Sequence, residues 1–178
     1  MLANVLRLHG GSRTGPKSTA YLPPVVGPPP LSVRYWLSEL ARLHGVGSHE
    51  AEELLRRFEF EGALRGPAHH LSTGNVRKVL LAATLTTRNR TVILDEPVSA
   101  LDAAGHRVLC DVVRAHAATG TSIVIAEHDV AWLRDVADRI VTLHDGRIAP
   151  GESAAGPDAA TIVLTGPSAR SSELLDLA

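Results

Sequence analysis

The sequence has one cysteine, almost no net charge and no long apolar run. Because Cys110 has no second cysteine to pair with, the chain forms no internal disulfide, which suits a reducing cytoplasm. A formal net charge of −1 excludes the strong positive field that would point to nucleic acid as a partner. No apolar stretch approaches the roughly 18 residues that a membrane-spanning helix needs. We therefore expect a chain that does not cross a membrane and that folds around one core.

The most informative segment is 91–102. Its apolar, mostly β-branched start predicts a buried strand of a parallel sheet over 91–95. Two adjacent carboxylates, Asp95 and Glu96, end the strand, and Pro97 prevents its simple continuation. An α/β fold places its ligand at the carboxyl edge of the sheet. Asp95 is therefore a candidate ligand of Mg²⁺, and Glu96 is a candidate to polarise a water that attacks a phosphoryl group.

Strands and helices alternate along most of the chain, and this predicts an α/β fold with a parallel sheet. We expect one domain over 1–148, with a helical subdomain over about 32–72, and then a linker and tail over 149–178 with a short strand at 161–164. The other strands are expected over 3–9, 91–95, 121–126 and 139–143. The helices are expected over about 33–44, from 48 onward, and over 75–86, 103–118 and 129–136.

The start of the helix near residue 75 is a candidate phosphate cradle. The segment Leu-Ser-Thr-Gly-Asn over 71–75 places Ser72 and Gly74 just before an apolar helix. A hydroxyl, a glycine that permits close approach and the first N–H groups of a helix can together bind a phosphate. Taken alone, the segment fits an ordinary N-capped helix better, since serine caps are common.

A second apolar strand pattern, 123–126, leads to His128. A histidine at the carboxyl end of a strand can reach a γ-phosphate and hold the attacking water in line. The remaining histidines have no such position, and the pair at 69–70 predicts a solvated turn rather than a metal site.

In this order, these segments resemble the motifs of the ATP-binding cassette (ABC) ATPases. Segment 91–102 resembles the family's Walker B motif and D-loop, and 71–82 resembles its signature motif, usually L-S-G-G-Q. His128 resembles the switch histidine. Thr73 and Asn75 depart from the usual signature. The resemblance implies a P-loop NTPase-like sheet core with an inserted helical subdomain.

The resemblance also implies the cofactors ATP and Mg²⁺ and gives roles to six residues. Signature residues of this family act on the ATP that the opposite subunit holds, and the D-loop aspartate organises the interface between subunits. Asp102 also fits a plain helix N-cap. The implied roles are catalytic for Glu96 and His128, nucleotide-binding for Ser72, Gly74 and Asp102, and metal-binding for Asp95.

Segment 11–19 matches a P-loop only in part. A P-loop has the pattern G-x-x-x-x-G-K followed by Ser or Thr and leads into a helix. Here Pro16 stands where the last glycine belongs, ahead of Lys17. Pro23 and Pro24 then leave no room for the helix that would bind the phosphate.

A second alignment fits better. Segment 4–10 resembles the family's strand and turn after the P-loop helix, and 20–24 resembles its Q-loop strand, with Pro24 in place of the glutamine. On this interpretation the chain is truncated upstream of the Q-loop region and lacks the P-loop and the N-terminal β-subdomain. Lys17 is then a chance match, and the isolated chain is inactive or weakly active.

Proteins of this family are ATPase subunits of transporters, and two of them enclose two ATP molecules. We expect this chain to power a separate transmembrane permease, together with a second ABC ATPase subunit, at the cytoplasmic face of the cell membrane. Segment 31–46 and the Leu-Ser-Thr-Gly-Asn form of the signature favour an exporter. A competing interpretation is a degenerate module that only completes a partner's ATP site. A soluble ABC ATPase of repair or translation is disfavoured, because the chain shows neither a second cassette nor a long insertion.

Overall fold

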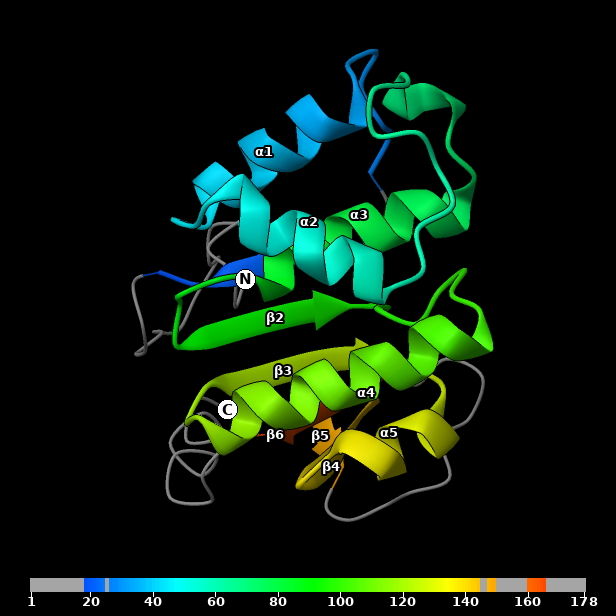
Figure 1. Cartoon of the computed structure of the whole chain (residues 1–178). Helices are drawn as coiled ribbons and strands as arrows, with labels where there is room; N and C mark the ends of the chain where they lie inside the picture. The colour runs from blue at the N-terminus through cyan, green and yellow to red at the C-terminus, as the bar shows by residue number, and fades with distance from the viewer. Residues whose placement is uncertain (1–17, 25, 145–146, 150–159, 166–178) are drawn as a thin grey trace.

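The computed structural model describes residues 18–24, 26–144, 147–149 and 160–165. The strand expected over 3–9 and most of segment 11–19, including Lys17, lie outside these residues. The described part is an α/β arrangement around a six-stranded sheet with the order β1-β2-β3-β6-β4-β5 (Figure 1). The predicted α/β class is therefore confirmed.

The first three strands of the sheet are parallel. They are β1 (Ala20–Leu22), β2 (Thr91–Asp95) and β3 (Ser122–Glu127). Their register aligns Leu22, Leu94 and Ile125 in one row across the sheet, and all three side chains are fully buried. Burying a side chain of this size contributes about 1.5–3 kcal/mol. This apolar row fixes the register just before each strand ends.

The other half of the sheet is antiparallel and differs from the expected all-parallel pattern. Strand β6 (Ala160–Thr165) pairs antiparallel with β3 on one side and with β4 (Arg139–His144) on the other. The short β5 (Arg147–Ala149) pairs antiparallel with β4. The strand expected over 161–164 is thus an inner strand of the sheet, whereas the sequence placed it in a tail beyond a domain ending at 148.

The helices form two groups (Figure 1). Helices α1 (Val33–Leu43), α2 (Ser48–Arg57) and α3 (Thr73–Leu85) pack on one another, and α3 also contacts β1. Helix α4 (Ala103–Ala118) packs on β3 and against α5 (Val130–Val136). None of the helices among the described residues is long and apolar enough to cross a membrane.

Helix α1 begins where the sequence predicts it. The Ser32 side chain accepts a hydrogen bond from the Tyr35 N–H, which satisfies one of the free donors at the helix start. Helix α1 then buries Val33, Leu37 and Ala41 on one face. Because α1 and α2 fall within 32–72 and pack on α3, they fit the expected helical subdomain; the division of the chain into domains stays a prediction.

Candidate functional site

Polar side chains gather where β2 and β3 end. Because the two strands are parallel and Asp95 is paired with Ala126, Glu96 and Glu127 follow at the same level of the sheet. His128 comes one residue later. The structure therefore brings Asp95, Glu96 and His128, three of the six predicted site residues, to one edge of the sheet, and adds Glu127.

Asp95 is half-buried and has a tyrosine beside it. The Tyr21 hydroxyl donates to Asp95 Oδ2 over 3.3 Å, from the neighbouring strand β1. Burial raises the pKa of Tyr21, and the negative charge of Asp95 raises it further, so the phenol stays protonated and can donate. One carboxylate oxygen of Asp95 is thereby oriented by a residue of the neighbouring strand.

Glu96 sits in a left-handed backbone conformation, with φ of 47°. This region costs a residue other than glycine about 1–2 kcal/mol, so surrounding contacts must hold it. The Glu96 N–H donates to the Ala126 carbonyl over 2.8 Å, and the Glu96 carbonyl accepts from the Ser99 N–H over 3.1 Å. The chain therefore turns sharply at the candidate catalytic residue, a feature that tends to occur at functional sites.

Glu127, the last residue of β3, is not among the site residues that the sequence predicts. Its side chain is 1% exposed, whereas that of His128 is 75% exposed. Glu127 accepts hydrogen bonds from the N–H groups of Val98, His128 and Asp129. A charged residue directly after four apolar strand residues was the only signal that could have marked it.

The signature-like segment begins α3 as expected. The Ser72 side chain caps the helix by accepting from the Asn75 N–H over 3.3 Å. Gly74 faces the loop after β2: a Cβ at this position would lie 2.7 Å from the carbonyl oxygen of Ala100. Gly74 is therefore required here by close packing within the chain, independently of any contact with phosphate.

Asp102 joins the same loop to α3. Its Oδ1 accepts from the Gly105 N–H over 2.6 Å, which caps α4, and its Oδ2 pairs with Lys78 Nζ over 2.8 Å. The hydrogen bond from Lys78 and the bond from Gly105 lower the pKa of Asp102. Lys78 also donates to the Glu59 carbonyl. The predicted N-cap is confirmed, and Ser72, Gly74 and Asp102 form a second cluster that the loop 97–101 connects to the first.

A buried cation that the sequence analysis passed over links α3 to the end of β1. Arg77 is 6% exposed, and its guanidinium donates to the backbone carbonyls of Pro23 and Pro24. Burial lowers the pKa of Arg77, while the charges of Glu96, Glu127 and Asp95 oppose that shift. In the sequence, the feature that could have indicated this residue is a positive charge within an otherwise apolar helix.

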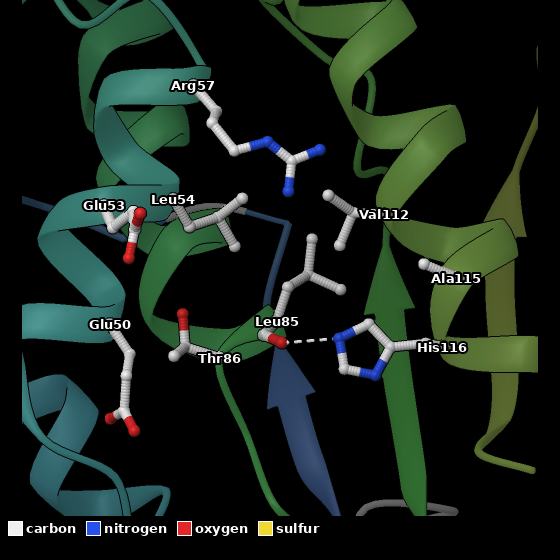
Figure 2. Close-up of a pocket in the computed structure, with 9 residues that line it drawn as sticks. All are labelled: Glu50, Glu53, Leu54, Arg57, Leu85, Thr86, Val112, Ala115 and His116. Carbon is white, nitrogen blue, oxygen red and sulfur yellow. Dashed lines mark hydrogen bonds between the residues drawn. The ribbon is translucent and has the colours of Figure 1, made fainter. Parts of the chain in front are cut away.

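A pocket of about 340 Å³ lies elsewhere, between α2, the end of α3 and α4 (Figure 2). The His116 ring nitrogen Nε2 lies 2.7 Å from the Leu85 carbonyl and, facing a pure acceptor, must donate to it. The pocket meets the last turn of α3, on the order of 20 Å from the first turn that holds Ser72 and Gly74. None of the predicted site residues lines it. Its lining residues are Glu50, Glu53, Leu54, Arg57, Leu85, Thr86, Val112, Ala115 and His116.

Within the described ranges, no group of three or more His, Cys, Asp or Glu side chains could hold a metal ion by itself. Mg²⁺ does not require such a group, because it is usually held by one or two carboxylates together with phosphate oxygens and water. The half-buried Asp95 carboxylate at the sheet edge fits this mode of binding.

The known proteins to which the chain is similar are of one kind. The chain is 39% identical over 111 residues to the lipoprotein-releasing system ATP-binding protein LolD of Zymomonas mobilis, which covers 60% of this chain and 47% of LolD. The chain therefore spans about half the length of this relative. A solved structure of an ATP-binding subunit of an ABC transporter is 27% identical, with a TM-score of 0.62 over 73% of this chain and 56% of that one.

A more distant likeness shows the shared fold. A dimeric ATP-binding cassette, described as a post-hydrolysis state bound to ADP and Pi, is 19% identical with a TM-score of 0.63. The likeness covers 78% of this chain and 63% of the dimeric cassette's chain. No family model matches the chain. The curated relatives are thus ATP-binding subunits of ABC transporters, and the structural neighbours are ATP-binding cassettes.

Proposed function

Because the chain belongs to the ABC ATPase family, we propose that it is an ATP-binding and ATP-hydrolysing subunit of an ABC transporter that powers a separate membrane permease. The observation that carries the proposal is the edge where β2 and β3 end. There Asp95 is paired with Ala126 on the parallel strand β3, so Glu96 and His128 both follow closely after the last pair of the two strands. A phosphoryl-transfer site needs this combination of a metal ligand, a group that orients water and a group that contacts the γ-phosphate.

Each residue at this edge has a defined task in the proposal. Asp95 would hold Mg²⁺, which supplies charge neutralisation at the phosphates. Glu96 would accept a hydrogen bond from the attacking water and draw its proton away. The exposed His128 ring would orient the γ-phosphate and that water.

The second cluster would act on another subunit. We propose that Ser72 and Gly74 present the start of α3 to ATP held by a second ABC ATPase subunit, with Asp102 at the interface. The dimeric arrangement of the neighbouring cassette supports this. We further propose that the permease is an exporter, because segment 31–46 and the Leu-Ser-Thr-Gly-Asn form of the signature resemble those of exporters. The chain would lie at the inner face of the cell membrane, as expected of a transporter subunit.

One observation favours a second candidate, a module that only completes a partner's ATP site. The sequence has two lysines, Lys17 and Lys78, and neither follows the glycine that a P-loop requires. Lys78 is buried and paired with Asp102, so it is not free to hold a phosphate. Pro24, at the Q-loop position, has no amide side chain to offer a metal or water.

Hydrolysis of Mg·ATP by the purified chain separates the candidates. An ATPase subunit should turn over, and Glu96→Gln should lower kcat by about 10²–10⁴-fold, the usual contribution of a positioned acid or base. The exposed Glu53→Gln serves as a matched control and should leave the rate unchanged. Absence of turnover by the chain alone, together with stimulation of ATP hydrolysis by a complete ABC ATPase subunit, would favour the module. Absence of turnover and of any such stimulation would contradict both candidates.

A further inference from the structure

Glu127 is a charged residue held almost completely out of water. It is the last residue of β3, and its side chain is 1% exposed. Burying a carboxylate without partners is costly, so such a group persists only where hydrogen bonds or charges compensate it. None of the six predicted site residues is Glu127, so the burial of its carboxylate needs a separate explanation.

The two oxygens of Glu127 bind two different loops. Oε2 accepts from the Val98 N–H over 3.4 Å, in the loop after β2. Oε1 accepts from the His128 N–H over 2.8 Å and the Asp129 N–H over 3.3 Å, in the loop after β3. His128 Nδ1 is also 3.3 Å from Oε1. One side chain thus connects the loop that carries Glu96 to the loop that carries His128.

The loop after β2 is held at two points by β3. The first is the hydrogen bond from the Glu96 N–H to the Ala126 carbonyl, and the second is the bond from Val98 to Glu127. Between these points the backbone passes through the left-handed conformation at Glu96. The bond from Val98 to Glu127 therefore adds to the turn bond from Ser99 in holding this conformation.

Capping of α5 does not explain Glu127. Asp129 caps that helix itself, since its Oδ1 accepts from the Trp132 N–H over 3.1 Å. The buried Arg77 supplies a compensating positive charge, since the negative charge of Glu127 is one of those that oppose the lowering of the Arg77 pKa by burial. The carboxylate is therefore compensated within the site, and its hydrogen bonds are directed to the two functional loops.

We infer that Glu127 is a positioning residue that fixes the loops of Glu96 and His128 relative to each other. The inference rests on the proposed function. In that function the two loops act together, because they align a water with a phosphate. Because its side chain is buried, Glu127 acts in this proposal only through the two loops.

Amide hydrogen exchange of the purified chain, followed by NMR, tests the inference directly. In Glu127→Ala, the Val98, His128 and Asp129 amides should exchange about 10- to 100-fold faster, the effect of losing a hydrogen bond to a charged group. The strand amides of Leu94 and Ile125 should be unchanged. Glu53→Gln is the matched control.

Glu127→Gln keeps the shape of the side chain and sharpens the test. Its single carbonyl oxygen should remain at the Oε1 position, where two N–H groups converge, and its NH₂ group should face the Val98 N–H. We therefore expect Val98 to lose protection while His128 and Asp129 keep most of theirs. Unchanged exchange of all three amides, or equal loss throughout the β-sheet, would overturn the inference.

Addition of Mg·ATP gives a readout that a purely structural role would not move. In the wild type, Mg·ATP should change the amide shifts of both loops and slow the exchange of the Val98 and His128 amides. In Glu127→Gln, it should slow the exchange of His128 while Val98 stays less protected than in the wild type. Equal slowing of both amides in the wild type and the variant would overturn the inference. If the wild type shows no shifts, the proposed function fails, and the exchange experiment alone decides the inference.

Discussion

At the scale of single residues, two buried cations of α3 each have defined partners. Lys78 is buried on α3, and its ammonium group reaches Asp102 and the Glu59 carbonyl. Arg77, its neighbour on the helix, reaches the carbonyls of Pro23 and Pro24. The two adjacent cations therefore attach α3 to three segments, which follow β1, α2 and β2 in the chain.

The Lys78–Asp102 pair predicts an acid-sensitive contribution to stability. Because the pKa of Asp102 is lowered in the folded chain, its contribution is present above the unfolded value, about 3.9, and is lost as pH falls through the lowered pKa. Asp102→Asn keeps the N-cap but loses the charge. We expect it to lower the free energy of unfolding by up to about 1 kcal/mol, since Asp102 is largely exposed.

Urea unfolding at pH 7, 5, 4 and 3 measures this effect. The difference between wild type and Asp102→Asn should be constant from pH 7 to 5 and should shrink below about pH 4. Asp111→Asn removes one exposed charge from the same helix and is the control. A difference that stays the same at every pH would contradict the role of the charge.

At the scale of elements, the start of α3 and the loop 97–101 form one packed unit. Ser72 caps the helix, Gly74 lies against Ala100, and Asp102 closes the loop onto Lys78. The two predicted clusters are therefore mechanically connected, because the loop that leaves Glu96 is the one that α3 packs against.

Gly74→Ala tests this packing. Its Cβ would lie 2.7 Å from the Ala100 carbonyl oxygen, a backbone atom that cannot rotate away. We expect a loss of about 1–3 kcal/mol of stability, the usual cost of overpacking. Gly27→Ala is the control, since a Cβ there meets nothing within 4 Å. Equal urea midpoints for the two variants would show that the contact imposes no constraint.

At the scale of the whole molecule, the sheet depends on its last strand. Strand β6 separates β3 from β4 and pairs with both. The pairing is long-range, so the sheet is completed by residues far along the chain from its first strands. The parallel half, which bears the candidate site, is joined to β4 and β5 through β6.

Val163→Pro tests this dependence. Val163 is paired with Ile125 on one side and Ile140 on the other, and proline removes the backbone N–H from an inner strand. We expect a loss of about 1–3 kcal/mol, the cost of leaving the facing backbone acceptor without its hydrogen bond, seen as a lower Tm. Val163→Thr keeps the N–H and a β-branched side chain and should change Tm far less. An unchanged Tm for the proline variant would show that β6 is dispensable.

The local part of this architecture follows from the sequence. Apolar, β-branched runs and capping serines or aspartates determine β2, β3, α1 and α4 close to the predicted bounds. Such features depend on neighbours within a few residues, so they are visible in the printed chain. The carboxylates Asp95 and Glu96 at the end of a buried strand belong to this part, because a parallel strand brings its end to the ligand-binding edge.

Only the tertiary structure decided the rest. The local sequence of a strand in a tail does not differ from that of a strand inserted between β3 and β4, because the pairing partners lie tens of residues away. Likewise, the role of Glu127 depends on Val98, and that of Arg77 on Pro23 and Pro24. The sequence by itself determined the elements and the chemistry at their ends; long-range hydrogen bonding and burial determined which of those ends are held together.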